Sequence, residues 1–259
     1  MRKDKPKLFS DWREFFREFI IIVFGVLTAL FAQSIAENLA WRQKVRAATD
    51  DMRQELGSGD APQNYVRLMM SQCFSDRLAA VKQAIEAGDR TGSRRLVPTL
   101  WLPVGTFDNY AWENAVSSEI STHIPQRQKY EFRISYVMMP ELDAVRGKML
   151  GELASLRSIP RDGGSLDQAE KQIALEAVAN LEMDNHRMER ASSFTLRHMR
   201  NLGIGIDRDQ LHRRIAEANM HYAGCLTTDG NVLRSMISGK VFADRRLRSM
   251  ISGKVFDPR

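Results

Sequence analysis

The nearest approach to a catalytic constellation in this sequence is a polar stretch at residues 112–123. Glu113, Ser117 and His123 are residue types of a serine-hydrolase triad, and they lie within about a dozen positions. On one short helix Glu113 and Ser117 would share a face, but His123 would fall past the helix end, and no strained nucleophile turn is indicated. We therefore interpret Trp112 as a packing residue and Ser117 as a polar residue near a helix end.

Other motifs that would carry chemistry are missing from the sequence. The five histidines are scattered, with no H-E-x-x-H motif and no pair at i, i+4 that would favour zinc. There is no G-x-S-x-G motif and no Walker loop, and Gly203 with Gly205 lacks the third glycine and the preceding strand of a dinucleotide site. We predict no catalytic residue, no metal ligand and no cofactor.

The two cysteines, Cys73 and Cys225, lie far apart, and neither belongs to a C-x-x-C motif. In an oxidising compartment we expect them to form a disulfide, and closing a loop of about 150 residues would contribute roughly 4 to 5 kcal/mol in the chain-entropy model. The alternative is a pair of buried, unbonded cysteines that act as small apolar side chains.

An apolar segment near the N-terminus predicts a membrane-spanning helix over Phe19 to Ala36. Its eighteen residues contain no charge, and at about 1.5 Å per residue they span roughly 27 Å, close to the hydrocarbon thickness of a bilayer. Trp12 and Trp41 bracket the segment about 43 Å apart along a helix, which matches the two headgroup regions where indole rings settle. The lipid bilayer is therefore the first expected partner, with Trp12 and Trp41 as interface anchors.

A cleaved signal peptide is the alternative to an anchor, because Ser34 to Ala36 offers small residues where signal peptidase would cut after Ala36. Against cleavage, the preceding segment is long and carries four acidic residues, and the helical pattern continues beyond the site. An amphipathic helix through Trp41 is expected to run on from the membrane helix until the residues Gly57 to Pro62 break it.

Charge at the two ends of the span predicts the orientation. Six Lys or Arg residues precede it and four follow it in a comparable stretch, which favours a cytoplasmic N-terminus. In a bacterium the chain would then lie in the inner (plasma) membrane with its large domain in the periplasm. Residues 1–18 and 231–259 carry local balances of +2 and +5, so the 212 residues between them total −1 of the +6 overall. A neutral middle with basic ends argues against nucleic-acid binding.

The remainder predicts an all-α domain, because no sustained period-two pattern flanked by turns occurs. The expected parts are a cytoplasmic segment at 1–18, the transmembrane helix at 19–36, a juxtamembrane amphipathic helix and linker at 37–61, an extracytoplasmic helical bundle at 62–230 and a basic tail at 231–259. Within the bundle we expect a helix from Pro62 to Ala87, a loop at 88–106, a short helix through Trp112, two long antiparallel helices and a last helix.

Several residues predict where these helices begin, bend and end. Pro125 is suited to the first position of one long helix, with a kink expected at Pro140. Ser165 with Gln168 is expected to form a capping box for the next long helix, and Asp207 to cap the last helix.

The C-terminal tail contains one exact repeat, LRSMISGKVF at 233–242 and again at 247–256. Two copies are far fewer than a solenoid requires, so we interpret them as a local duplication that extends a basic tail. The alternative is an apolar face formed by both copies on an anionic lipid surface or a partner, which Gly239 and Gly253 weaken.

Several of these features occur together in one family. The segment WREFFREFIIIVFGVLTALFAQSIAENLAWRQKV, the cysteine helix with Asp76-Arg77-Leu78, the WENAVSS helix and the late second cysteine resemble N-terminally anchored, single-pass membrane proteins of α-proteobacteria. The resemblance covers residues 12 to about 226 and departs from the family at the duplicated tail. It implies the anchor and the cysteine pair, and it implies no activity.

The leading functional hypothesis is a non-enzymatic scaffold or partner-binding module of the cell envelope, acting with a protein partner or as a homo-oligomer. The alternative is a membrane-tethered hydrolase or ligand-binding enzyme that uses residues 88–123. A third hypothesis is a lipid-surface protein that acts through the basic tail.

Overall fold

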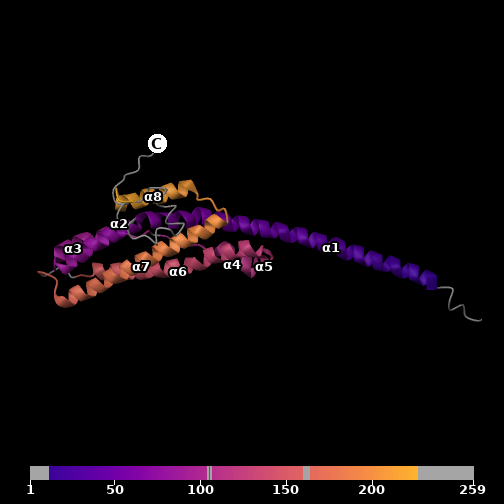
Figure 1. Cartoon of the computed structure of the whole chain (residues 1–259), viewed down its shortest axis with the longest axis horizontal. Helices are drawn as coiled ribbons and strands as arrows, with labels where there is room; N and C mark the ends of the chain where they lie inside the picture. The colour runs from indigo at the N-terminus through magenta and orange to yellow at the C-terminus, as the bar shows by residue number, and fades with distance from the viewer. Residues whose placement is uncertain (1–11, 104, 106, 160–163, 227–259) are drawn as a thin grey trace, which may run out of the picture. The chain divides into compact units, whose positions relative to one another are not determined.

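The computed structural model describes residues 12–226, apart from 104, 106 and 160–163 and the side chains of residues 13 and 14. Throughout these described residues the regular structure is helical, with no strand, which confirms the all-α prediction (Figure 1). The chain divides into two compact units, Met1–Thr49 and Asp50–Arg259. The duplicated tail and residues 1–11 of the N-terminal segment lie outside the described residues.

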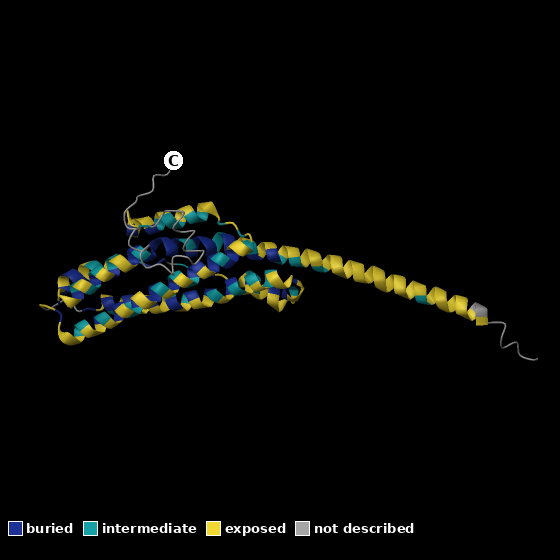
Figure 2. Cartoon of the chain, in the orientation of Figure 1, coloured by how far each residue is buried: buried dark blue, intermediate teal, exposed yellow. Residues whose placement is uncertain are grey.

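The first unit consists, where it is described, of most of helix α1 (Trp12–Glu55). Among the described residues this is the one helix long and apolar enough to cross a membrane, and none of its apolar window is buried. Phe24 and Phe31 are 68% and 69% exposed. Figure 2 shows exposed residues along the helix. An apolar surface of this size has no stable place in water, so the helix requires an apolar environment.

The prediction that Gly57 to Pro62 break the helix after α1 is wrong. The chain passes through a π-helical turn, η1 (Leu56–Asp60), directly into α2 (Ala61–Glu86). In a π-helix each N–H donates to the carbonyl five residues earlier, but Pro62 has no N–H. The Gly57 carbonyl, five residues before Pro62, instead accepts the Asp207 amide at 3.0 Å. The glycines and the proline are thus accommodated by one wide turn, and no linker separates the two helices.

Helix α2 has a long interface with α7 (Gln168–Asn201) and a smaller one with α8 (Arg208–Tyr222), whereas α6 (Gln126–Arg157) packs mainly against α7. Helices α6 and α7 pack along each other as the predicted antiparallel pair. One apolar stripe of α2 is buried throughout, and it consists of Val66, Met70, Cys73, Leu78, Val81 and Ile85.

The second unit also contains shorter helical elements: α3 (Arg90–Leu96), the 3-10 turn η2 (Val97–Thr99), α4 (Tyr110–Ser117) and α5 (Ile120–His123). Residues 90–99 therefore form a short α-helix followed by a 3-10 turn in place of the expected loop. Leu100 and Leu102, which follow these elements, are buried.

Two of the capping predictions have different outcomes. Asp207 caps α8 by accepting the Gln210 amide at 3.0 Å, as predicted. The capping box of α7 is formed by Asp167 and Glu170, not by Ser165 and Gln168. Asp167 accepts the Glu170 amide at 2.8 Å, and Glu170 accepts the Asp167 amide at 2.9 Å. A carboxylate at the helix start binds these amides more strongly than a hydroxyl would.

Candidate functional site

The two cysteines form the predicted disulfide, with Cα atoms 5.7 Å apart. Cys73 is fully buried on α2, whereas Cys225 follows α8 at the surface. The bond therefore fixes the end of the last described helix to the centre of the bundle.

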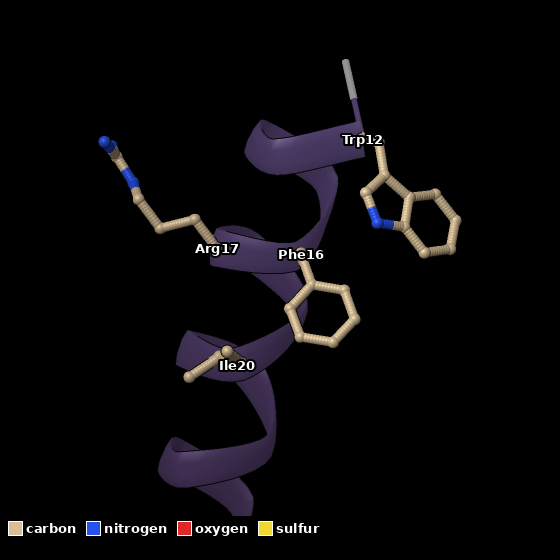
Figure 3. A pocket seen from close by; sticks show the side chains of 4 residues that line it. All are labelled: Trp12, Phe16, Arg17 and Ile20. Atoms are coloured by element: carbon tan, nitrogen blue, oxygen red, sulfur yellow. The ribbon is translucent and has the colours of Figure 1, made fainter. Parts of the chain in front are cut away.

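The tryptophans expected at the membrane interfaces both lie on α1. Trp12 is 65% exposed and its ring centroid lies 6.0 Å from that of Phe16. With Arg17 and Ile20 these two residues line a shallow, open hollow, in which the two rings lie on one side of the helix and Arg17 extends away from them (Figure 3). Trp41 is half-buried, with the Lys44 ammonium 4.6 Å from its ring centre.

The polar residues at 112–123 have contacts that fit a structural role. The Asn109 amide donates to Glu113 at 2.6 Å, and the hydroxyl of Ser117 donates back to the Asn114 carbonyl at 3.2 Å. Trp112 stacks on Tyr136, with ring centroids 5.9 Å apart. His123 lies on α5, a separate helix from the one that carries Glu113 and Ser117.

A second group of polar residues, which sequence reasoning did not identify, is buried inside the second unit. Its acidic half consists of Asp60 and Glu55. Asp60 is 1% exposed and lies at the end of the π-helical turn. Burial, together with the charge of Glu55, raises the pKa of Asp60 to about 8, although the backbone N–H of Asp108 donates to its carboxylate. Asp60 is therefore mostly protonated at neutral pH.

Glu55 is the second carboxylate of the acidic half. Its carboxylate accepts the Ala111 amide at 3.1 Å and a hydrogen bond from the Tyr136 hydroxyl. The same hydroxyl lies 3.3 Å from the Met52 carbonyl, and burial followed by the charge of Glu55 raises the pKa of Tyr136 far above its ordinary value. The phenol remains a donor at all physiological pH values.

The basic half centres on Arg67, two turns along α2 from Asp60 and 5% exposed. Its Nη1 is 3.8 Å from the Met188 sulfur, and its guanidinium carbon lies 5.2 Å from the ring centre of Phe107. Nε and Nη2 have no hydrogen-bond partner among the described residues. Burial, together with the neighbouring charge of Arg146, lowers the pKa of Arg67 to about 9, so it stays protonated at neutral pH.

Three further charges surround Arg67: Arg146, Asp143 and Arg214. Asp143 lies 3.2 Å from Arg146 Nη2 and accepts the Phe107 amide at 3.3 Å. A Cβ atom at Gly105 would lie 3.4 Å from Arg214 Nη1, so this arginine of α8 packs against the loop that contains Gly105. We call Arg67, Asp143, Arg146 and Arg214 the arginine cluster.

One pattern in the sequence marks residues of this site but does not reveal their burial. Asp60, Asn64, Arg67 and Ser71 follow one another at helical spacing and are all buried. A polar stripe opposite an apolar one ordinarily indicates a solvent-exposed face. Here Phe107 lies against Arg67 and α8 packs against α2, and only the tertiary structure shows this.

Among the described residues no group of three or more side chains is arranged to hold a metal ion. No protein-family model, curated protein or solved structure matches the chain significantly.

Proposed function

We propose that this chain is a single-pass membrane protein of the bacterial inner membrane whose helical domain lies in the periplasm and binds an envelope partner without chemistry of its own. The observation that carries the proposal is the helix α1, which is apolar over a membrane-spanning length and has none of that window buried. Such a surface is stable only in lipid or against another apolar surface.

The Cys73–Cys225 disulfide supports the periplasmic side, because structural disulfides persist in oxidising compartments. The excess of Lys and Arg before the span supports the same orientation. These two arguments rest on different residues and agree.

A binding role is supported by the way the polar residues are used. The Ser117 hydroxyl bonds to a carbonyl of its own helix, and Trp112 packs on a neighbouring ring. A tethered hydrolase acting through Glu113 and His123 would need these groups available to a substrate, and the Glu113 carboxylate is instead bonded to Asn109. We therefore favour a module that acts through partners.

Intact-mass measurement of the protein recovered from washed membranes tests the anchor. The proposal predicts that residues 19–36 are present and that the protein remains with the membrane after alkaline extraction. Replacing Phe24 and Val26, both exposed on α1, by arginine should release it or prevent insertion, because each charge at the centre of a span costs about 2.5 to 3.5 kcal/mol. A mature N-terminus at Glu37 would instead establish a cleaved signal peptide.

Crosslinking in intact membranes tests the partner. We expect one reproducible complex, either with a second copy of the chain or with another envelope protein, that is lost when α1 is replaced by a cleavable signal sequence. Loss of a hydrolytic activity in Glu113→Gln or His123→Ala variants that fold normally would support the enzyme instead.

A further inference from the structure

We propose that the arginine cluster binds a small oxyanion, best matched by a phosphate group, on the Nε and Nη2 edge of Arg67. The inference does not depend on the membrane side or on the partner proposed above. It rests on the burial, the hydrogen bonding and the charge of the cluster.

The first argument is the unpaired edge of a buried cation. Arg67 is 5% exposed, and the two nitrogens without a protein partner, Nε and Nη2, belong to the same edge of the guanidinium. These two N–H groups are parallel and match two oxygens of a carboxylate or phosphate. Leaving a buried guanidinium without an acceptor costs several kcal/mol, which a bound oxyanion would offset.

The second argument is the local charge. Arg67, Arg146 and Arg214 contribute three positive charges, and Asp143 is the one carboxylate among the charges acting on Arg67. The cluster therefore carries a formal excess of two positive charges. A dianionic phosphate would neutralise it, whereas a single carboxylate would leave one charge uncompensated.

The third argument is that the other two arginines also have unpaired donors. The Nε atoms of Arg146 and Arg214 are buried without a protein hydrogen-bond partner. Asp143 does not satisfy this demand, because its Oδ2 accepts the Phe107 amide and its Oδ1, although 3.2 Å from Nη2 of Arg146, forms no hydrogen bond within the described residues. Three elements, α2, α6 and α8, thus each contribute one arginine with unused donors.

The carboxylates of the acidic half do not fill this role. Glu55 is occupied by the Ala111 amide and the Tyr136 hydroxyl, and Asp60 is mostly protonated at neutral pH. Neither is among the charges acting on Arg67. Asp143 of the arginine cluster also acts on Asp60, but because Asp60 is mostly protonated the cluster retains its excess positive charge.

Calorimetric titration of the full chain in detergent micelles, in buffer free of phosphate, sulfate and carboxylates, tests the proposal. Inorganic phosphate should bind saturably at one site per chain, and sodium chloride at equal ionic strength should not. Arg67→Lys keeps a charge but loses the two-pronged edge, and Arg214→Gln loses a charge at a half-buried position. Each should weaken phosphate binding by about ten-fold or more.

Arg213→Gln is the matched control, because Arg213 neighbours Arg214 on α8 and is exposed. Its affinity for phosphate should equal that of the wild type. Circular dichroism and the unfolding midpoint establish whether each variant is folded, and if Arg67→Lys is not, Arg214→Gln alone decides.

A second titration identifies the source of the phosphate group. Submicellar dihexanoyl phosphatidic acid presents a lipid phosphate, whereas inorganic phosphate presents a free one. Binding of either with the stated loss in Arg214→Gln supports the site and tells which source it accepts. If neither binds saturably, or if Arg214→Gln and Arg213→Gln bind like the wild type, the proposal is wrong.

Discussion

Tyr222 forms two hydrogen bonds with the backbone of Trp101, a residue 121 positions earlier. Its hydroxyl donates to the Trp101 carbonyl at 2.7 Å and accepts the Trp101 amide at 3.0 Å. The ring is fully buried, with the Arg77 guanidinium 4.2 Å from its centre, and burial raises the pKa of Tyr222 to about 12. This phenol, three residues before Cys225, fastens the end of α8 to the segment that precedes α4.

Tyr222→Phe should lower the free energy of unfolding by about 1 to 3 kcal/mol. The substitution keeps the ring but leaves a peptide N–H and a carbonyl of Trp101 without their partner. Urea denaturation followed by circular dichroism would measure the change. An unfolding free energy equal to that of the wild type would show that solvent replaces both bonds.

Reduction of the Cys73–Cys225 disulfide should destabilise the second unit. The bond closes a loop of 152 residues, for which the chain-entropy model gives about 5 kcal/mol. Unfolding with and without reductant measures the difference, and a Cys225→Ser variant should unfold at the same denaturant concentration as the reduced protein. An unchanged midpoint on reduction would mean that the tertiary contacts of α8 suffice.

Asp60 should make stability fall as pH rises. Its pKa in the folded state, about 8, lies above the ordinary value of 3.8. Between pH 3.8 and about pH 8 the folded state therefore keeps a proton that the unfolded state has released. The stabilisation is full below about pH 4 and decreases up to about pH 8, by at most about 1.4 kcal/mol per pH unit.

The Asp60→Asn variant should remove this component of the pH dependence, because its amide has no proton to lose. Urea midpoints at pH 6 and pH 9 would show a smaller difference for Asp60→Asn than for the wild type. Asp51→Asn, at an exposed position on α1, serves as the control and should keep the wild-type difference. Equal slopes in all three proteins would contradict the buried, protonated state of Asp60.

Alanine substitution at two glycines of η1, Gly57 and Gly59, should change the free energy of unfolding differently. A Cβ at Gly57 would lie 2.7 Å from the Gly205 carbonyl oxygen, so Gly57→Ala should cost about 1 to 3 kcal/mol. A Cβ at Gly59 would meet nothing within 4 Å, so Gly59→Ala should be neutral or stabilise by up to about 1 kcal/mol. Denaturant unfolding of both variants measures this; equal effects would argue against the close approach at Gly57.

The repeating patterns of the sequence predicted most of the helices, because apolar periodicity and caps such as Asp207 act locally. The π-helical turn could not be predicted, since it depends on Asp207, 150 residues away, which supplies the donor that Pro62 lacks. The same limit applies to the arginine cluster. Arg67 belongs to a polar stripe of the sequence, and its burial depends on tertiary packing by Phe107 and α8.

The most direct test of the membrane topology is thiol labelling of bacterial cells that produce the full chain, using a small membrane-impermeant maleimide. Intact and permeabilised cells are treated with and without prior reduction, and the peptides that contain Cys73 and Cys225 are quantified by mass spectrometry. We expect labelling of intact cells only after reduction, first at the exposed Cys225. Free thiols that react only after permeabilisation would contradict the account and place the helical domain in the cytoplasm.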